Sequence, residues 1–165
     1  MRYLQTDGRD IEDFIKHHSY PQDKLNVEDL KNKRVLDAGT GFGTLVEDLR
    51  RNGIEADGLD ISLPASLKGK PHYIEADMID TGIDPAIYDV IYANFTLFMY
   101  EGDNLTLQLA ALRELSRILK NGGVIRIYPA FPSIAIVLKR IPELKIVEPL
   151  IVLQEGLFIE LKKTD

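Results

Sequence analysis

The chain has 165 residues, 45% of them hydrophobic, which is enough for one well-buried core and predicts a single domain over residues 1–165. The absence of cysteine excludes disulfides and thiolate metal sites, and we expect no bound metal. The net charge of −6 argues against nucleic acid as a partner. No apolar run reaches the ~18 residues that span a bilayer, and the N-terminus does not read as a signal peptide, so we expect a cytoplasmic protein with no membrane partner.

The first 32 residues precede the predicted sheet, and we expect residues 1–32 to form an N-terminal extension or lid. An apolar helical face predicts a helix over residues 10–18, with His18 on that face. Asn26 is placed to cap a single helical turn over residues 27–31.

Short apolar runs alternate with helical patterns through residues 33–165, which predicts an α/β core with a mostly parallel sheet. The expected parallel strands cover residues 34–37, 55–59, 73–76, 89–93 and 124–128. Two last apolar runs, residues 145–153 and 157–161, are predicted to close a seven-stranded sheet as an antiparallel pair. Helices on both faces of the sheet would make three layers.

The first crossover helix is predicted to follow the first strand directly. Thr44 and Glu47 have the spacing of a capping box, and residues 52–53, Asn-Gly, end the helix. The next crossover is different, because residues 61–71 contain two prolines and a glycine. We expect at most a short helix there.

The second half of the chain carries one long helical pattern. Asp103 or Asn104 is placed to cap it, and residues 121–123, Asn-Gly-Gly, are predicted to stop it. Pro132 suits the first position of a further helix that ends before Pro142.

A glycine-rich turn follows the first predicted strand. It reads Asp37-x-Gly39-x-Gly41-x-Gly43 and leads straight into a helix. Glycines let the backbone turn tightly and approach a ligand, and the helix N-terminus presents free N–H groups to an anionic group. A dinucleotide fingerprint would require Gly or Ala at Thr44, so the spacing disfavours a nicotinamide dehydrogenase.

Polar side chains also end the next three predicted strands. Asp60 lies 21 residues after the first glycine of the turn, where a carboxylate suits a ribose diol. Asp77 and Met78 follow the third strand, and Asn94 and Phe95 follow the fourth. The carboxyl ends of parallel strands meet at one edge of a sheet, which is where open α/β folds place ligands. Met78 has an alternative interpretation as a filler of the core.

The segment LDAGTGFG resembles the first motif of the class I S-adenosylmethionine-dependent methyltransferases, an acidic residue followed by alternating glycines. The segment ALRELSRILKNGGVIRI is similar to that family's helix and fifth strand, with Asn121 where proline is usual. The resemblance covers roughly residues 33–128. It implies a Rossmann-like fold, S-adenosylmethionine as cofactor, and an acid after the third strand that reads the adenine amine. The residues implied to bind the cofactor are Asp37, Gly39, Thr40, Gly41, Gly43, Asp60, Ile61, Asp77, Met78, Asn94 and Phe95.

The resemblance implies an enzyme that transfers a methyl group, and we expect a small-molecule acceptor that the fold does not name. Residues 94–97 differ from the Asn/Asp-Pro-Pro-aromatic motif of amide and base N-methyltransferases, which disfavours those acceptors. The candidates for a general base are Tyr100, Glu101, Tyr128 and His18, and none has a decisive pattern.

Two further expectations concern the acceptor. No insertion within residues 33–161 is long enough to roof a site, so residues 1–22 are predicted to form part of the acceptor pocket. The alternative is a helix that only covers a sheet edge. A protein methyltransferase and a non-catalytic cofactor-binding or partner-binding module of the same fold stay open, as does the oligomeric state.

Overall fold

The computed structural model describes residues 10–165, apart from the side chains of residues 148–149. The helices are α1 (Ile11–His18), the 3-10 helix η1 (Gln22–Lys24), α2 (Val27–Leu30), α3 (Thr44–Arg51), α4 (Leu97–Tyr100), α5 (Leu105–Ile118) and α6 (Ile134–Leu138). The strands are β1 (Arg34–Ala38), β2 (Glu55–Asp60), β3 (Tyr73–Glu75), β4 (Tyr88–Asn94), β5 (Leu119–Ala130), β6 (Leu144–Val152) and β7 (Leu157–Lys163).

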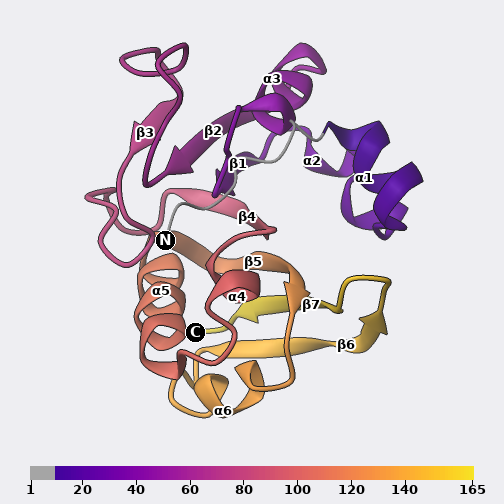
Figure 1. Ribbon diagram of the computed structural model, residues 1–165, viewed down its shortest axis with the longest axis vertical. Coiled ribbons are helices and arrows are strands. Elements are labelled where there is room, and N and C mark those ends of the chain that lie inside the picture. Colours follow the sequence, from indigo (N-terminus) through magenta and orange to yellow (C-terminus); the bar gives the residue numbers. More distant parts are fainter. Residues whose placement is uncertain (1–9) are drawn as a thin grey trace.

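These strands form one seven-stranded sheet in the order β3-β2-β1-β4-β5-β7-β6 (Figure 1). The first five pair in parallel, and β7 runs antiparallel to both β5 and β6. The predicted fold class, with its C-terminal antiparallel pair, is confirmed. The order reverses at β1, which has β2 on one side and β4 on the other, and such a switch point is where open α/β folds bind ligands.

Two hydrophobic clusters lie on opposite faces of the sheet. One packs Phe14, Leu30 and Leu49, from α1, α2 and α3, against Val35 and Val90 of the strands. The other packs residues of α4, α5 and α6 against alternate strand residues. The period-2 alternation of strand side chains explains why neighbouring residues serve different layers. The predicted three-layer arrangement is therefore confirmed.

The start of α3 differs from the prediction. Its N-cap is Gly43, in the left-handed backbone region at φ 77°, so Thr44 lies inside the helix and makes no capping box. The Glu47 carboxylate accepts a hydrogen bond from the Tyr73 hydroxyl at 2.7 Å. Glu47, which the local pattern assigned to the helix cap, is thus bonded to Tyr73, a residue distant in the sequence.

The stop predicted at residues 121–123 is also wrong, because α5 already ends at Ile118 and these residues belong to β5. Leu119 pairs with Tyr88, and the register then shifts so that Val124 pairs with Val90. The Asn-Gly-Gly segment is thus an irregular strand start. Lys120 beside it reaches the Asp89 carboxylate at 2.9 Å.

Other local predictions have clearer outcomes. The Asn104 side chain accepts from the Leu107 N–H at 3.0 Å and caps α5, as expected. The helix placed at Pro132 begins two residues later, at Ile134, and is short. Residues 61–72 hold turns and no helix, so the second crossover reaches β3 without one. Within residues 10–165, no helix is long and apolar enough to cross a membrane.

Candidate functional site

The glycine turn after β1 is held against β2 by its own backbone. The N–H groups of Gly39 and Thr40 both donate to the Leu59 carbonyl oxygen, at 2.7 and 2.9 Å. Gly39 has φ +89°, and a Cβ there would lie 2.2 Å from the Thr96 methyl carbon, so only glycine fits. Gly41 has φ +55°, and its missing Cβ would meet nothing within 4 Å. The turn therefore exposes bare backbone to open space at the N-terminus of α3.

Asp60 connects the end of β2 to this turn. One carboxylate oxygen accepts from the Gly41 N–H at 2.9 Å, and the other accepts from the Ser62 N–H at 3.0 Å. Each carboxylate oxygen has two lone-pair sites, so both retain one for a further donor. The Ile61 side chain beside it is 57% exposed. The sequence-predicted pair of glycine turn and strand-end acid is thus in direct contact.

Asp37 is buried beneath the turn. Burial raises the pKa of its carboxyl to about 7, the Thr40 hydroxyl opposes this rise, and the Asp60 carboxylate adds to it. A carboxyl group titrating near neutrality at a ligand-binding edge is a functional-site signal. Its negative charge would be stabilised by a cation brought to this edge.

A group of buried polar atoms surrounds the turn without hydrogen-bond partners of ordinary geometry among the described residues. They are Tyr20 Oη, Thr40 Oγ1, Thr96 Oγ1 and both amide atoms of Asn94. All four residues are at most 8% exposed. Burial raises the pKa of Tyr20 well above its ordinary value, and the Asn94 amide close by opposes part of that rise. Buried groups of this kind are normally satisfied, so their gathering here points to a polar ligand.

Asp77 and Met78 follow β3 at the same edge of the sheet. One Asp77 carboxylate oxygen accepts from the Ile79 N–H at 3.1 Å, which folds the turn after the strand. Met78 is 8% exposed and belongs to the core cluster under α5. Its packing therefore agrees with the core-filling interpretation that the sequence left open.

Phe95 follows Asn94 and turns the chain at φ 52° into an aromatic cluster. Its ring lies 4.9 Å from that of His18, 5.5 Å from that of Tyr128 and 6.3 Å from that of Phe14. Phe95 thus packs against α1 from the N-terminal extension. This contact brings residues 10–18 to the carboxyl end of β4.

Glu155, in the turn between β6 and β7, joins two of the candidate bases. His18 Nδ1 lies 2.9 Å from one Glu155 oxygen, and the Tyr128 hydroxyl donates to the other. Burial opposes ionisation of Glu155, but the hydrogen bonds from Tyr128 and His18 lower its pKa overall. Tyr128 is fully buried, so its hydroxyl serves this network rather than an open pocket.

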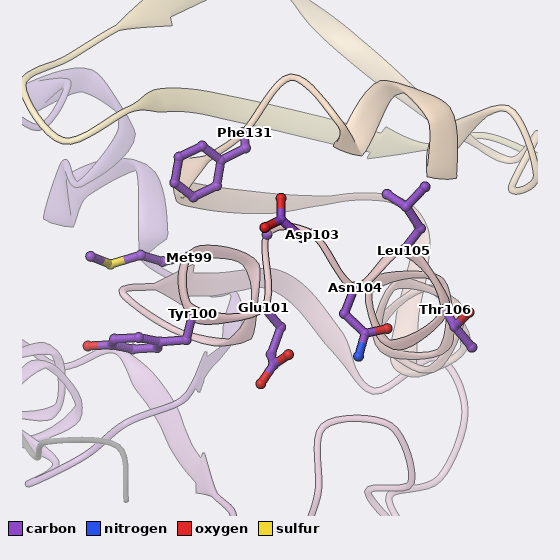
Figure 2. Close-up of a pocket in the computed structure, with 9 residues that line it drawn as sticks. Met99, Tyr100, Glu101, Asp103, Asn104, Leu105, Thr106 and Phe131 are labelled. Atoms are coloured by element: carbon purple, nitrogen blue, oxygen red, sulfur yellow. The ribbon is translucent and has the colours of Figure 1, made fainter. Parts of the chain in front are cut away.

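The other two candidate bases, Tyr100 and Glu101, line a cavity of about 810 Å³ (Figure 2). It lies where the segment after β4 meets Phe131, which follows β5. Since the ends of β4 and β5 are paired through Asn94 and Tyr128, this cavity opens at the same edge as the glycine turn. None of its lining residues carries one of the buried polar atoms, so the two are separate, although both lie near the carboxyl ends of the strands.

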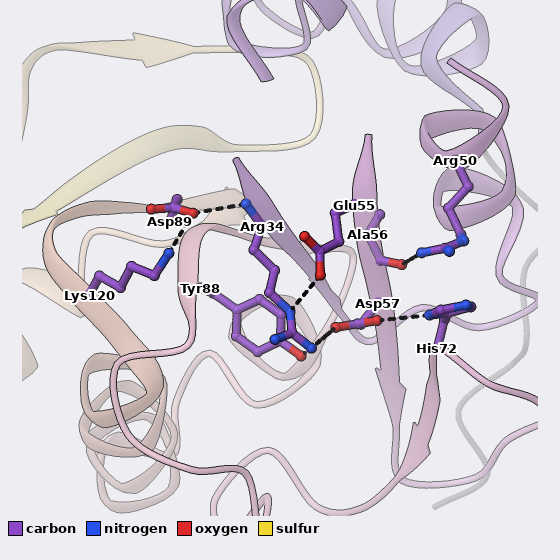
Figure 3. A network of polar contacts seen from close by, with 9 residues as sticks. All are labelled: Arg34, Arg50, Glu55, Ala56, Asp57, His72, Tyr88, Asp89 and Lys120. Atoms are coloured by element: carbon purple, nitrogen blue, oxygen red, sulfur yellow. Dashed lines mark hydrogen bonds and ion pairs between the residues drawn. The ribbon is translucent and has the colours of Figure 1, made fainter. Parts of the chain in front are cut away.

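The opposite edge of the sheet carries a structural network (Figure 3). Asp57, in β2, contacts Arg34 at 3.2 Å, the Tyr88 hydroxyl at 2.9 Å and His72 at 3.4 Å. Asp89 accepts from the Arg34 N–H at 2.8 Å. These contacts satisfy the buried Asp57 charge far from the carboxyl ends of the strands.

Several residues of the site have no local signature in the sequence. Thr96 and Tyr20 belong to the buried polar group, and Glu155 joins α1 to the last hairpin. Only the position of Thr96, two residues after a strand-end asparagine, offered a clue. The other two arrive through tertiary packing over long sequence separations.

Comparison with known proteins identifies the class. A family model described as a methyltransferase domain matches residues 36–127, and the chain belongs to this family. The resemblance to class I S-adenosylmethionine-dependent methyltransferases is thereby confirmed at the level of the family.

Two curated relatives illustrate the likeness. A malonyl-[acyl-carrier protein] O-methyltransferase of Enterobacter lignolyticus is 32% identical over 117 residues, which are 68% of this chain and 42% of the relative. A magnesium-protoporphyrin O-methyltransferase of Rhodobacter capsulatus is 28% identical over 115 residues, covering 64% of this chain and 48% of the relative. The chain thus spans less than half the length of these relatives.

Solved structures share the fold. The N-methyltransferase NodS of Bradyrhizobium japonicum superposes with a TM-score of 0.63 at 15% identity, covering 86% of this chain and 92% of that one. The 1,6-didemethyltoxoflavin-N1-methyltransferase of Burkholderia thailandensis has a TM-score of 0.62 at 16% identity, covering 94% and 87%. Its structure contains S-adenosylhomocysteine.

Proposed function

We propose that this chain binds S-adenosylmethionine at the carboxyl edge of β1, β2 and β4 and transfers its methyl group to a small-molecule acceptor. The observation that carries the proposal is the buried polar group of Tyr20, Thr40, Asn94 and Thr96 around a glycine turn. These donors and acceptors fit the polar ends of an amino-acid-bearing nucleoside. Family membership and relatives with small or carrier-linked acceptors support the same function.

The proposal gives each part of the site a task. The α3 N-terminus and the N–H groups of the glycine turn suit a carboxylate, and the Asp37 carboxylate suits an ammonium group. Asp60 retains acceptor sites for a ribose diol, with Ile61 beside it for the base. Asp77 would accept from the adenine amine.

S-adenosylmethionine supplies an electrophilic methyl carbon on a sulfonium sulfur. In the transfer, the acceptor atom forms a bond to that carbon as the sulfur–carbon bond breaks, and the bonding pair goes to sulfur. The protein's contribution is to position both reactants and to keep water away. An acceptor that starts protonated needs a base, for which Tyr100, Glu101 and His18 remain the candidates.

The alternatives are a protein acceptor and a non-catalytic module of the same fold. Cofactor binding is common to all three, so turnover must separate them. Incubation with a metabolite extract and the cofactor, followed by measurement of S-adenosylhomocysteine, tests the small-molecule enzyme. Cytoplasmic location stays a prediction from the sequence.

The Asn94→Leu variant tests whether the buried polar group around the glycine turn binds the cofactor. The Asn94 amide makes no hydrogen bond of ordinary geometry to the described residues, so replacing it by an apolar side chain of similar size should leave the free energy of unfolding unchanged or raise it. The same change should weaken S-adenosylhomocysteine binding by about tenfold or more in calorimetry. A residue that only supported the fold would show the reverse, with lost stability and unchanged affinity. Unchanged affinity in a stable variant would contradict the proposal.

A further inference from the structure

Polar side chains form a row across one face of the sheet, through four neighbouring strands. The residues of the row, paired in register from β1 to β7, are Asp37, Tyr92, Arg126 and Glu160. Residues paired in this way point to the same face, here the one that α1, α2 and α3 cover. Three of the four are buried, and the Arg126 side chain is 12% exposed. The acid beneath the glycine turn therefore shares a face of the sheet with the buried Arg126–Glu160 ion pair.

This row holds Lys24, the last residue of η1, by its backbone and by its side chain. The Lys24 carbonyl oxygen accepts hydrogen bonds from the Tyr92 hydroxyl and from Arg126 Nη1, the latter at 2.7 Å. Arg126 Nε donates to one Glu160 oxygen at 2.6 Å, and the other Glu160 oxygen accepts from Lys24 Nζ at 3.2 Å. Charge-assisted hydrogen bonds that are shielded from water hold their groups more firmly than exposed ion pairs do. The N-terminal segment is thus anchored to the sheet at Lys24.

Tyr20 lies in the same segment, between α1 and η1. Its ring packs edge-on against those of Tyr128 and Phe158, with ring centroids 5.8 and 5.2 Å away. The residue is 2% exposed, yet its hydroxyl has no hydrogen-bond partner of ordinary geometry in the part of the chain that the structure describes. A buried hydroxyl of this kind is normally satisfied, so its presence points to a missing polar partner.

The surroundings of the Tyr20 hydroxyl are those of the glycine turn. Burial is the main cause of its raised pKa, and the groups that alter that pKa further are Tyr92 and Asp37, which raise it, and Arg126 and Asn94, which lower it. Asp37 lies one residue before the end of β1, and Asn94 is the last residue of β4. The hydroxyl therefore reaches the strand ends where the proposed function places the ammonium and carboxylate groups of the cofactor.

We propose that the Tyr20 hydroxyl binds the amino-acid end of S-adenosylmethionine, and that Arg126 is a positioning residue that holds Tyr20 there through the Lys24 carbonyl. A tyrosine hydroxyl can donate to a carboxylate or accept from an ammonium group. The inference rests on the proposed function and divides the N-terminal segment, because Tyr20 serves the cofactor while α1 before it is left for the acceptor.

A pair of ligands tests the role of Tyr20. Methylthioadenosine has the adenosine and the thioether of S-adenosylhomocysteine but lacks its amino-acid end. Tyr20→Phe should weaken S-adenosylhomocysteine by about tenfold in calorimetry and leave the affinity for methylthioadenosine unchanged. The variant should be as stable as the wild type, because the hydroxyl it loses has no partner of ordinary geometry among the described residues.

A double-mutant cycle tests the role of Arg126. Arg126→Gln and the milder Tyr92→Phe each remove a donor to the Lys24 carbonyl, so each should weaken S-adenosylhomocysteine severalfold. Neither should weaken it further in the Tyr20→Phe background, because both act through Tyr20. Arg34→Gln is the matched control, since it removes an arginine bound to Asp57 at the opposite edge. It should lower stability and leave both affinities unchanged.

The outcomes separate this inference from the proposed function. Wild-type affinity in Tyr20→Phe, or equal weakening of both ligands, would overturn the role of Tyr20. Effects of Arg126→Gln and Tyr20→Phe that simply add would overturn the positioning role, and Tyr92→Phe gives the same comparison should Arg126→Gln fail to fold. Each of these results is compatible with S-adenosylhomocysteine binding to the wild type, which would leave the proposed function standing. Failure of the wild type to bind S-adenosylhomocysteine would instead contradict the proposed function.

Discussion

The Asp60 carboxylate accepts a hydrogen bond from the Gly41 backbone N–H at 2.9 Å, across the gap between the end of β2 and the glycine turn after β1. The contact joins two motifs 19 residues apart in the chain. It also means that Asp60 has a structural task besides any contact with a ribose.

Asp60→Ala should therefore weaken cofactor binding through two routes. Loss of hydrogen bonds to a charged acceptor costs roughly 1.5–3 kcal/mol, or about 10- to 150-fold in Kd. Asp60→Asn keeps an oxygen that can accept from Gly41 and should retain more of the fold's stability than the alanine variant. Calorimetry with S-adenosylhomocysteine measures the affinity and thermal melting measures the stability. Wild-type affinity in Asp60→Ala would show that the ribose is held elsewhere.

The pKa of Asp37 predicts a pH dependence of stability. Burial raises it from 3.8 to about 7 in the folded chain, so between about pH 4 and 7 the folded state holds a proton that the unfolded state has lost. The stabilisation from this group is complete below about pH 4 and disappears as the pH rises through about 7. Its size is of the order of 4 kcal/mol.

Asp37→Asn, which has the same shape and no titration, should lack this component. The difference in unfolding free energy between wild type and variant, measured by urea denaturation from pH 4.5 to 7.5, should shift steadily in favour of the variant as the pH rises. A difference independent of pH would mean that Asp37 is ionised in the folded chain throughout this range.

Asp57 provides a control at the opposite edge of the sheet (Figure 3). It is buried between Arg34, Tyr88 and His72. Because Arg34 is partly exposed, we expect Asp57→Asn to cost about 1–3 kcal/mol in unfolding free energy, measured by denaturation. Its affinity for S-adenosylhomocysteine should stay at the wild-type value. If Asp57→Asn is as fully folded as the wild type yet binds S-adenosylhomocysteine much more weakly, the network around Asp57 and the glycine turn are energetically coupled.

The N-terminal segment is best tested through Glu155. Phe14 and Tyr20 are 4% and 2% exposed, so deleting residues 1–22 would damage the core as well as any pocket. Glu155→Gln removes only the negative charge of the carboxylate that contacts His18 and accepts a hydrogen bond from Tyr128. Hydrogen exchange of the α1 amides should then speed up while that of α5 stays unchanged, and cofactor affinity should remain within a few-fold. Loss of cofactor binding would indicate that α1 closes over the cofactor instead of the acceptor.

The sequence predicted the parts of this molecule that depend on local pattern. The strand ends at Asp60 and Asn94 and the Asn104 cap lie where period and capping rules place them. The capping box at Thr44 failed because Tyr73, 26 residues beyond Glu47, binds the Glu47 carboxylate. No local rule contains such a contact.

Some residues of the candidate site could likewise be predicted from local pattern, and others could not. The glycine turn and the acids at strand ends have sequence signatures because each sits at a fixed point of the strand–turn–helix unit. The buried Tyr20 hydroxyl, the Glu155 carboxylate and the cavity beside Phe131 depend on how distant segments pack. Side-chain identity alone does not reveal such packing.

Direct titration of the chain with S-adenosylhomocysteine and, separately, with NAD tests the central claim most directly. We expect S-adenosylhomocysteine to bind one site and, at 100 times its Kd, to stabilise the folded chain by about 2.7 kcal/mol, with a matching rise in Tm. NAD should leave the Tm unchanged. Stabilisation by NAD without any response to S-adenosylhomocysteine would contradict the account.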